Sequence, residues 1–442
     1  MKLKRIAFIV LVGFVYAAVP FTAEFGIGNA SVQAAEDKKT RQKTRRVPAM
    51  SEQTFKKLSE AQEFLDLKDY QGALLVLNKM LDRRKRLNGN EIGQVHNMLG
   101  FVYFSMDDFE GAIREYEAVI AQGDKVTEGL ETTVLYTLAQ LSFVVDSFED
   151  ALRYMEIWIE KATNPGPEPR IFMGQVYYQM QDFPNAIVQI EFGIQVAVDR
   201  GTAVKENWWG LLNYLYFEQE NWPKVLEILE ILVRDFPKRE YWVRLAGVYG
   251  QQEQEKEQLY SMQAAYTAGF LERETDLNNF AGLLMQDEVP FRAATVLAQG
   301  FKDGTVEKTA KNLRNLGQAW QLSQEVAKAI PVFEDAGKLS DDGKIFERLA
   351  HLYLEDDQYS KCVSAANNAL EKGGLRKVQT THVVRGMCLY NQDKLVGARG
   401  SFVSCRNESR RVKDAGGRRM CQQWITHIDN ESKRRKALAD AI

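Results

Sequence analysis

Hydrophobic and small residues recur along this chain with a period of about 35 residues. In each copy, a small residue is followed at fixed distances by two aromatic residues, an alanine and a large residue. The clearest copies are Gly100, Tyr103, Phe109, Ala112, Tyr116 and Gly174, Tyr177, Phe183, Ala186, Ile190. The spacing predicts two helices joined by a short turn, with the small residue at their crossing and the large residue wedged against it. Such a pair cannot bury its apolar face alone, so we expect consecutive pairs to stack.

The pattern continues in both directions and predicts ten helix pairs. Five form an N-terminal array over residues 54–238, and five form a more degenerate C-terminal array over residues 239–412. The sixth pair matches least well, because polar residues such as Gln258 occupy positions that are otherwise apolar or small. Gly247 and Gly250 in the same pair suggest a flexible or closely packed joint between the two arrays.

These repeated positions resemble the tetratricopeptide repeat (TPR) family over roughly residues 54–412. The resemblance implies an all-α fold, a right-handed superhelical solenoid of about ten helix-turn-helix repeats with a C-terminal capping helix. An unrelated α-helical array is the alternative, but it would not keep a small residue at one phase and an aromatic residue three positions later. The resemblance is specific for fold and says little about function.

The N-terminus predicts export. Three basic residues precede an apolar stretch over residues 6–19, and small residues lead to Ala34, so residues 1–34 are interpreted as a cleaved signal peptide. The alternative is an uncleaved anchor, although the stretch is interrupted at Gly13 and is shorter than the ~20 apolar residues that a membrane span needs. We therefore expect a periplasmic protein, with peripheral contact at the inner membrane as a further option.

Residues 35–53 are rich in lysine and arginine and poor in apolar residues, which predicts a basic flexible leader. The leader could contact anionic lipid head groups or an acidic partner, or it could be solvated. The formal net charge of the chain is only −3. This mild balance argues against nucleic acid as the partner, because binding a phosphate backbone requires a broad positive face.

All four cysteines lie late in the chain, and an even number in an exported protein favours disulfides. A bridge between Cys405 and Cys421 would attach the terminal helix to the solenoid. Cys362 and Cys388 could form a second bridge or remain two buried thiols. The cysteines include no C-x2-C pair and the histidines are scattered, so we expect no metal site.

The last segment, residues 413–442, predicts an amphipathic capping helix and a basic tail. Met420, Trp424 and Ile428 recur at four-residue steps, as expected for a face that covers the last repeat. The other face could in addition dock to an acidic partner or a membrane surface. Its basic residues, here called the basic cap, are Arg418, Arg419, Lys433, Arg434, Arg435 and Lys436.

Catalytic motifs are missing from the sequence: there is no phosphate-binding glycine loop, no G-x-S-x-G and no H-E-x-x-H. Acidic pairs such as Asp107-Asp108 fall in predicted turns, where aspartate caps helices. We therefore expect neither enzymatic activity nor a cofactor. An enzyme or ligand carrier within residues 239–307 is the alternative, although no titratable cluster marks that region.

The first helices of repeats two to five carry aromatic and amide residues one and four positions after the small residue, and Tyr136 lies one turn earlier in the third repeat. These positions should face the concave side of a superhelix and could bind a peptide. The alternative is that the rings pack between neighbouring first helices. This candidate set, the aromatic surface, comprises Phe101, Phe104, Tyr136, Gln140, Phe143, Gln175, Tyr178, Tyr214 and Phe217.

The amino-acid sequences of three segments, residues 128–133, 135–143 and 165–169, resemble those of periplasmic TPR proteins that accompany TonB systems in marine gammaproteobacteria. This resemblance implies a protein–protein interaction scaffold that is an accessory of a TonB–ExbB–ExbD complex and supports iron–siderophore uptake. Its partners would be periplasmic segments of TonB, ExbB or ExbD. The alternative is a general periplasmic scaffold for cell-wall or outer-membrane assembly.

Overall fold

The computed structural model describes residues 45–440, so the predicted signal peptide lies outside the described residues. Within this range the chain forms α-helices joined by turns, two short 3₁₀ helices and no strand. The helices are α1 (Glu52–Asp66), α2 (Tyr70–Leu81), η1 (Arg84–Arg86), α3 (Gly89–Ser105), α4 (Phe109–Ile120), η2 (Gly123–Lys125), α5 (Glu128–Val144), α6 (Phe148–Lys161), α7 (Glu168–Gln179), α8 (Phe183–Asp199), α9 (Glu206–Glu218), α10 (Trp222–Asp235), α11 (Arg239–Gln251), α12 (Glu255–Thr267), α13 (Glu274–Gln286), α14 (Pro290–Asp303), α15 (Ala310–Leu322), α16 (Val326–Lys338), α17 (Lys344–Glu355), α18 (Tyr359–Lys372), α19 (Val378–Asn391), α20 (Leu395–Arg411) and α21 (Ala415–Asp440).

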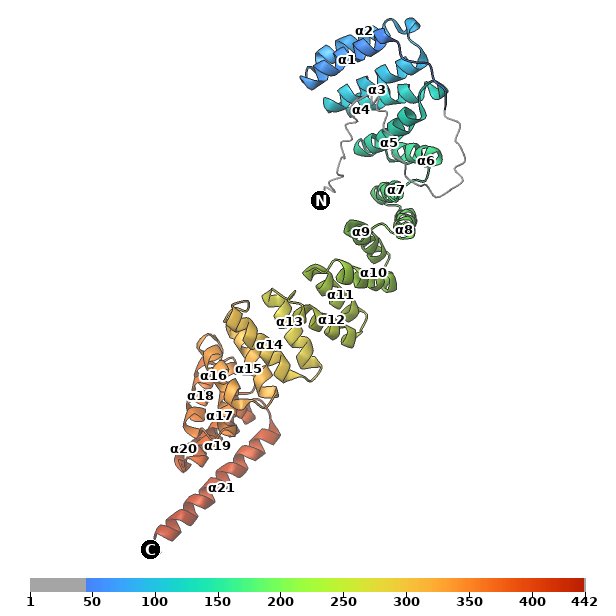
Figure 1. Ribbon diagram of the computed structural model, residues 1–442. Coiled ribbons are helices and arrows are strands. Elements are labelled where there is room, and N and C mark those ends of the chain that lie inside the picture. Colours follow the sequence, from blue (N-terminus) through green and yellow to red (C-terminus); the bar gives the residue numbers. More distant parts are fainter. Residues whose placement is uncertain (1–44, 441–442) are drawn as a thin grey trace, which may run out of the picture.

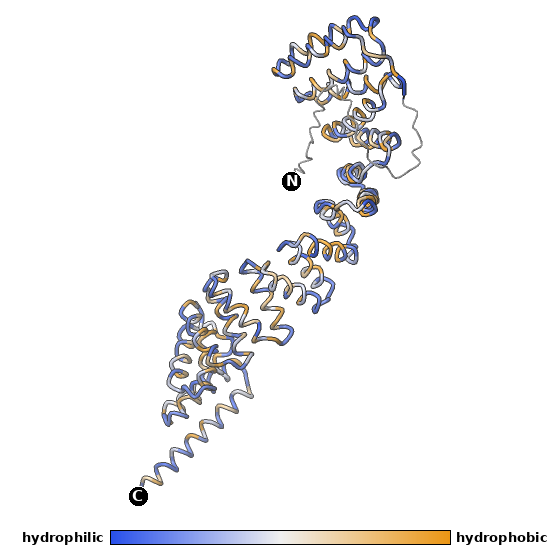
Figure 2. Tube along the Cα trace, in the orientation of Figure 1, coloured by the Kyte–Doolittle hydropathy of each residue, from blue (hydrophilic) through white to orange (hydrophobic). Residues whose placement is uncertain are grey.

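Helices α1–α20 form ten consecutive pairs that stack into an elongated, curved array, with α1 and α2 at one end and α21 at the other (Figure 1). Each pair packs mainly on the pairs before and after it, as the contacts between successive helices show. Hydrophobic and hydrophilic positions alternate along the helices (Figure 2). The buried apolar side chains form clusters that overlap from one repeat to the next. The fold is therefore an all-α TPR solenoid of ten repeats, as the sequence predicted.

The turn inside each pair has one recurring geometry. The first helix ends, one residue adopts the left-handed conformation, and the second helix begins two residues later. In the first pair, the N–H of Asp69 donates to the carbonyl of Phe64 at 2.8 Å, which closes the end of α1. The Asp69 side chain then accepts from the N–H of Gly72 and caps α2. The left-handed residues are Lys68, Asp107, Asp146, Gln181, Glu220, Glu253, Glu288, Gln324, Asp357 and Asp393.

The small residue of the repeat lies beneath the large residue of the second helix, as predicted. A Cβ atom added to Gly100 would stand 2.7 Å from the Tyr116 ring, and one added to Gly317 would stand 2.8 Å from the Phe333 ring. Phe333 is fully buried. Only a residue without a side chain lets these helices approach so closely.

The junction between repeats six and seven, inside the C-terminal array, combines limited helix packing with an ion pair. Helices α12 and α13 pack less extensively than any other two consecutive helices of the array. Across this junction, Arg239 at the start of α11 donates two hydrogen bonds of 2.6 Å to the carboxylate of Asp276 in α13. The Asp276 side chain is only 4% exposed. Gly250 is closely packed under the Gln258 side chain, whereas Gly247 faces open space.

The end of the predicted flexible leader is attached to the folded repeats. The Arg45 guanidinium donates to Glu131 at 2.9 Å and pairs with Asp124 at 3.0 Å. The backbone N–H of Ser51 donates to Glu91 at 2.9 Å, and Ser51 caps α1. Residues 45–51 therefore differ from the expectation of a flexible segment, because their charged and polar groups find partners on α3 and α5. The earlier residues of the leader lie outside the described part.

Helix α21 covers the last repeat but uses a slightly different face from the one predicted. Cys421, Ile425 and Ile428 are buried against α20, and the Trp424 ring stacks on Phe402 with centroids 5.1 Å apart. Met420, expected on the covering face, is 39% exposed. The difference amounts to one residue around the helix, which places Cys421 opposite Cys405.

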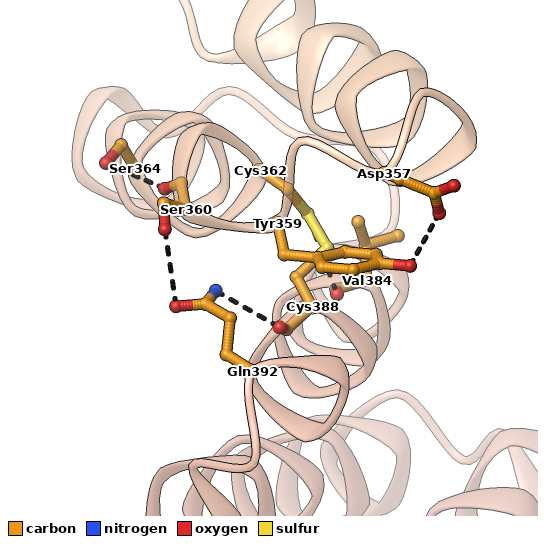
Figure 3. The surroundings of a disulfide bond; sticks show 8 residues. All are labelled: Asp357, Tyr359, Ser360, Cys362, Ser364, Val384, Cys388 and Gln392. Atoms are coloured by element: carbon orange, nitrogen blue, oxygen red, sulfur yellow. Dashed lines mark hydrogen bonds between the residues drawn. A yellow bond between two sulfur atoms is a disulfide. The ribbon is translucent and has the colours of Figure 1, made fainter.

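Both predicted cysteine pairs are bridged. Cys362 of α18 is bonded to Cys388 of α19, and their Cα atoms are 6.2 Å apart (Figure 3). Cys405 of α20 is bonded to Cys421 of α21, with a Cα separation of 6.1 Å. Both separations lie in the range that a disulfide can span. The alternative of two buried free thiols at Cys362 and Cys388 is not what the structure shows, and both bridges fit an oxidising compartment.

Candidate functional site

The nine residues of the aromatic surface lie on α3, α5, α7 and α9, the first helices of repeats two to five. Four of the rings share one position and one contact. Each ring packs against the first residue of the second helix in its own repeat, at centroid distances of 5.4 to 6.1 Å. These pairs are Phe104 with Phe109, Phe143 with Phe148, Tyr178 with Phe183 and Phe217 with Trp222. The fold thus holds each of these rings against a second ring of its own repeat.

Some rings also connect neighbouring repeats. Phe143 on α5 meets Phe172 on α7 at 5.7 Å, and Tyr178 on α7 meets Tyr214 on α9 at 5.8 Å. Both are contacts between consecutive first helices, which is the packing alternative raised from the sequence. Phe143 and Tyr178 therefore help to pack consecutive first helices against each other.

Exposure divides the set. Phe101 is 40% exposed, Tyr214 40% and Phe217 43%, whereas the remaining rings and both amides are half-buried. Burial comes first among the causes that raise the pKa of Tyr214, followed by the nearby charge of Glu218, so its phenol stays protonated at neutral pH. The surface offers exposed ring area, a hydroxyl donor and amide groups. It can bind a peptide by apolar contact and hydrogen bonds, and its binding role stays a prediction.

The structure shows a second candidate site on the first helices of the C-terminal array. This basic pocket has a volume of about 790 Å³ and lies between α15, α17 and the start of α19. Its lining residues are Arg314, Gln318, Gln321, Phe333, Lys344, Ile345, Glu347, Arg348, His351, Glu355, Arg376, Lys377 and Thr380. Five of these side chains are lysine or arginine and two are glutamate.

Sequence reasoning did not find this pocket, although a signal was available. Gln318 and Gln321 stand one and four positions after the small residue Gly317, the same positions that defined the aromatic surface. The arginines fall outside this rule. Arg314 and Arg348 come from different helices, 34 residues apart in the numbering, and only the stacking of repeats places them at one pocket.

The basic cap is partly neutralised. Arg434 and Arg435 both pair with Glu431 at 2.7 Å, and Arg435 also reaches Asp393 at 2.9 Å. Hydrogen bonds from Arg434 and then Arg435 lower the pKa of Glu431 to about 2. Among described residues, Arg418, Arg419, Lys433 and Lys436 make no ion pair and are exposed. A docking role for this face stays a prediction.

Residues 45–440 contain neither a membrane-spanning helix nor a metal-binding cluster. None of the helices there is long and apolar enough to cross a membrane. In the same range, no three histidine, cysteine, aspartate or glutamate side chains gather in a way that could hold a metal ion.

No protein-family model matches this chain, and no curated protein matches its sequence. Among solved structures, a TPR protein from Parabacteroides merdae is 15% identical, and the match covers 69% of this chain and 100% of that one with a TM-score of 0.34. PilF of Pseudomonas aeruginosa is 16% identical over 49% of this chain and 96% of its own, with a TM-score of 0.34. MamA is 16% identical over 38% of this chain and 93% of its own, with a TM-score of 0.32. These likenesses concern the fold alone.

Proposed function

We propose that this chain is a non-catalytic scaffold of the periplasm that binds a segment of a partner protein on its aromatic surface. The open stacking of helix pairs supports the general role, because a solenoid presents an extended surface that a compact domain lacks. The observation that carries the proposal is the exposure of Phe101, Tyr214 and Phe217, at two-fifths of each side chain or more. Exposed rings on a rigid backbone give contact area at little cost in conformational entropy.

The partner that we propose is the TonB–ExbB–ExbD complex, so that the chain is an accessory of iron–siderophore uptake. This finer proposal is supported by the sequence resemblance of the early repeats and by the predicted signal peptide. The two disulfides support an oxidising compartment such as the periplasm.

The test is mild crosslinking followed by purification of the chain from membranes. A triple variant, Phe101→Ser, Tyr214→Ser and Phe217→Ser, should lose the captured partner while its helical content stays unchanged. Tyr260→Ser is the matched control, because Tyr260 is an exposed ring, at 64%, on a second helix outside the surface.

Capture of TonB, ExbB or ExbD by the unmodified chain, lost in the triple variant, supports both parts of the proposal. Capture of cell-wall or outer-membrane assembly proteins instead would reject the TonB assignment and favour the general scaffold. Equal capture by the triple variant and the unmodified chain would reject the aromatic surface as the binding site.

A further inference from the structure

The basic pocket carries positive charge that the surrounding chain does not neutralise. Among the residues that the structure describes, Arg314, Arg348 and Arg376 make no ion pair, and Lys344 pairs with Asp342 at 2.7 Å. Asp342 also lies near enough to Arg314 to feel its charge, although Lys344 is the stronger influence on the lowered pKa of Asp342. The unpaired arginines come from three consecutive first helices or their starts, so the excess charge extends across three repeats.

The Glu347 carboxylate, the acid nearest to Arg348 in sequence, is already engaged. Its Oε1 accepts a hydrogen bond from the Thr381 hydroxyl at 2.8 Å and another from the Thr380 hydroxyl at 3.3 Å. It therefore fastens α17 to α19 and forms no ion pair with an arginine of the pocket.

Arg348 is the central group of the pocket. Its guanidinium is half-buried, donates to the Gln321 side chain at 3.2 Å and lies 5.7 Å from the centroid of the Phe333 ring. Burial, and then the charge of Arg314, lower the pKa of Arg348. A cation that is held in place, partly removed from water and close to a like charge is stabilised when an anion occupies the space in front of it. The guanidinium fork matches a carboxylate in a bidentate arrangement.

The size and lining of the pocket favour a peptide over a single small ion. Its volume of about 790 Å³ is far larger than a single small ion needs and can take a ligand of many atoms. The amides of Gln318 and Gln321 can pair with peptide groups, and the buried side chain of Ile345 supplies an apolar part of the wall. Because the arginines recur along the stack of repeats, they suit an extended chain with acidic side chains at intervals.

We infer that the basic pocket binds an acidic peptide segment of a partner protein, with Arg348 and Arg314 pairing with its aspartate or glutamate side chains. Arg376 would hold a further carboxylate at the α19 end of the pocket. The inference rests on the proposed function, since it names the chemistry of a protein ligand. It adds a second binding surface, separate from the aromatic one.

The test is fluorescence anisotropy with the oxidised chain and a fluorescein-labelled hexapeptide of alternating glutamate and aspartate. The comparison peptide alternates glutamine and asparagine, which keeps the shape and removes the charge. The acidic peptide should bind at least about tenfold more tightly, and the difference should shrink as salt rises. Arg348→Gln and Arg314→Gln should each weaken binding about tenfold or more, as the loss of a charge-assisted hydrogen bond predicts.

Arg292→Gln is the matched control, because Arg292 is exposed on the second helix α14, makes no ion pair with a described residue and does not line the pocket. Binding by this variant should equal that of the unmodified chain. Because Arg348 is half-buried, circular dichroism accompanies each variant, and the exposed Arg314 keeps the test decisive if Arg348→Gln does not fold.

Three results would overturn the inference: equal binding of the two peptides, unchanged binding by Arg314→Gln, or full displacement of the peptide by an equal concentration of inorganic phosphate at constant ionic strength. The last would show a site for any small anion. The aromatic triple variant separates this inference from the proposed function. If that variant loses its captured partner while the pocket variants bind as the unmodified chain does, only the pocket inference fails.

Discussion

The aromatic surface and the basic pocket share two positions of the repeat's first helix but differ in the chemistry they offer. After its small residue, the N-terminal array places Phe101 and Phe104, whereas at the same two positions the C-terminal array places Gln318 and Gln321. The rings are packed against their own repeats, while the arginines beside the amides lack ion-pair partners within residues 45–440. The repeat therefore fixes which positions share this face of the first helices, and the residues at those positions fix the chemistry that the face presents.

The largest effect is expected where repeats six and seven meet, in the part of the chain that separates the aromatic surface from the basic pocket. Arg239→Met leaves the carboxylate of Asp276 buried without its partner, which should lower the free energy of unfolding by about 3–5 kcal/mol. Urea denaturation measures the loss. Arg244→Met, an exposed position on the same helix, should cost far less. Equal costs would mean that the ion pair does not hold the junction.

Removing the disulfides should affect the C-terminal end of the array and leave the helices of the aromatic surface unchanged. Replacing Cys362 and Cys388 by alanine should cost about 3 kcal/mol, and removal of the Cys405–Cys421 bridge a similar amount, because the loops they close span 26 and 16 residues. Hydrogen exchange should rise in α18–α21 and stay unchanged in α3–α6. A rise of the same size in α3–α6 would contradict the view that each repeat depends mainly on its neighbours.

The close contact between the small residue and the large residue of a helix pair should exclude a larger side chain beside the basic pocket as it does in the other repeats. Gly317→Ala puts a Cβ within 2.8 Å of the buried Phe333 ring and should destabilise the chain by about 1–3 kcal/mol. Gly247→Ala is the control, since a Cβ there has no heavy atom within 4 Å, and it should stabilise α11 by about 1 kcal/mol. Thermal melting distinguishes them, and a shift in the same direction for both would refute the steric account.

The smallest effect is the acid sensitivity that Glu91 gives to the start of the N-terminal array. Burial acts to raise the pKa of Glu91, but hydrogen bonds from Ser51, Asn88 and Thr54 together outweigh it, so this pKa lies below its ordinary value of 4.5. A group with a lowered pKa adds stability above that ordinary value and loses it as the pH falls through the folded-state pKa.

Glu91→Gln should therefore cost about 1 kcal/mol at neutral pH, as expected for a helix cap, and nothing once the carboxyl of the unmodified chain is protonated. Denaturation at pH 7 and at pH 3 measures how the difference shrinks. Glu63→Gln, an exposed carboxylate on α1, is the control and should show little dependence on pH. A cost independent of pH would show that the charge of Glu91 does not matter.

Much of the fold could be predicted because the residues that determine each helix pair lie close together in the sequence. The period of small, aromatic and large residues predicted ten pairs and the contact of Gly100 with Tyr116. The even set of late cysteines predicted the Cys405–Cys421 bridge and left the state of Cys362 and Cys388 open. The face of α21 was misplaced at Met420 because several apolar residues compete there, and packing against α20 chose Cys421 and Ile425. The attachment of Arg45 could not be predicted, since its partners Asp124 and Glu131 lie far along the chain.

The sequence by itself determined the helix pairs, their crossing points and their stacking, because these follow from side-chain size at fixed spacing within one repeat. Only the tertiary structure decided which rings are packed and which are exposed, as the contacts of Phe143 and the exposure of Phe217 show. It alone placed Arg314, Arg348 and Arg376 at one pocket. The physical reason is that burial and the pairing of charges depend on side chains from other repeats. The distances between such side chains cannot be read from the order of residues along the chain.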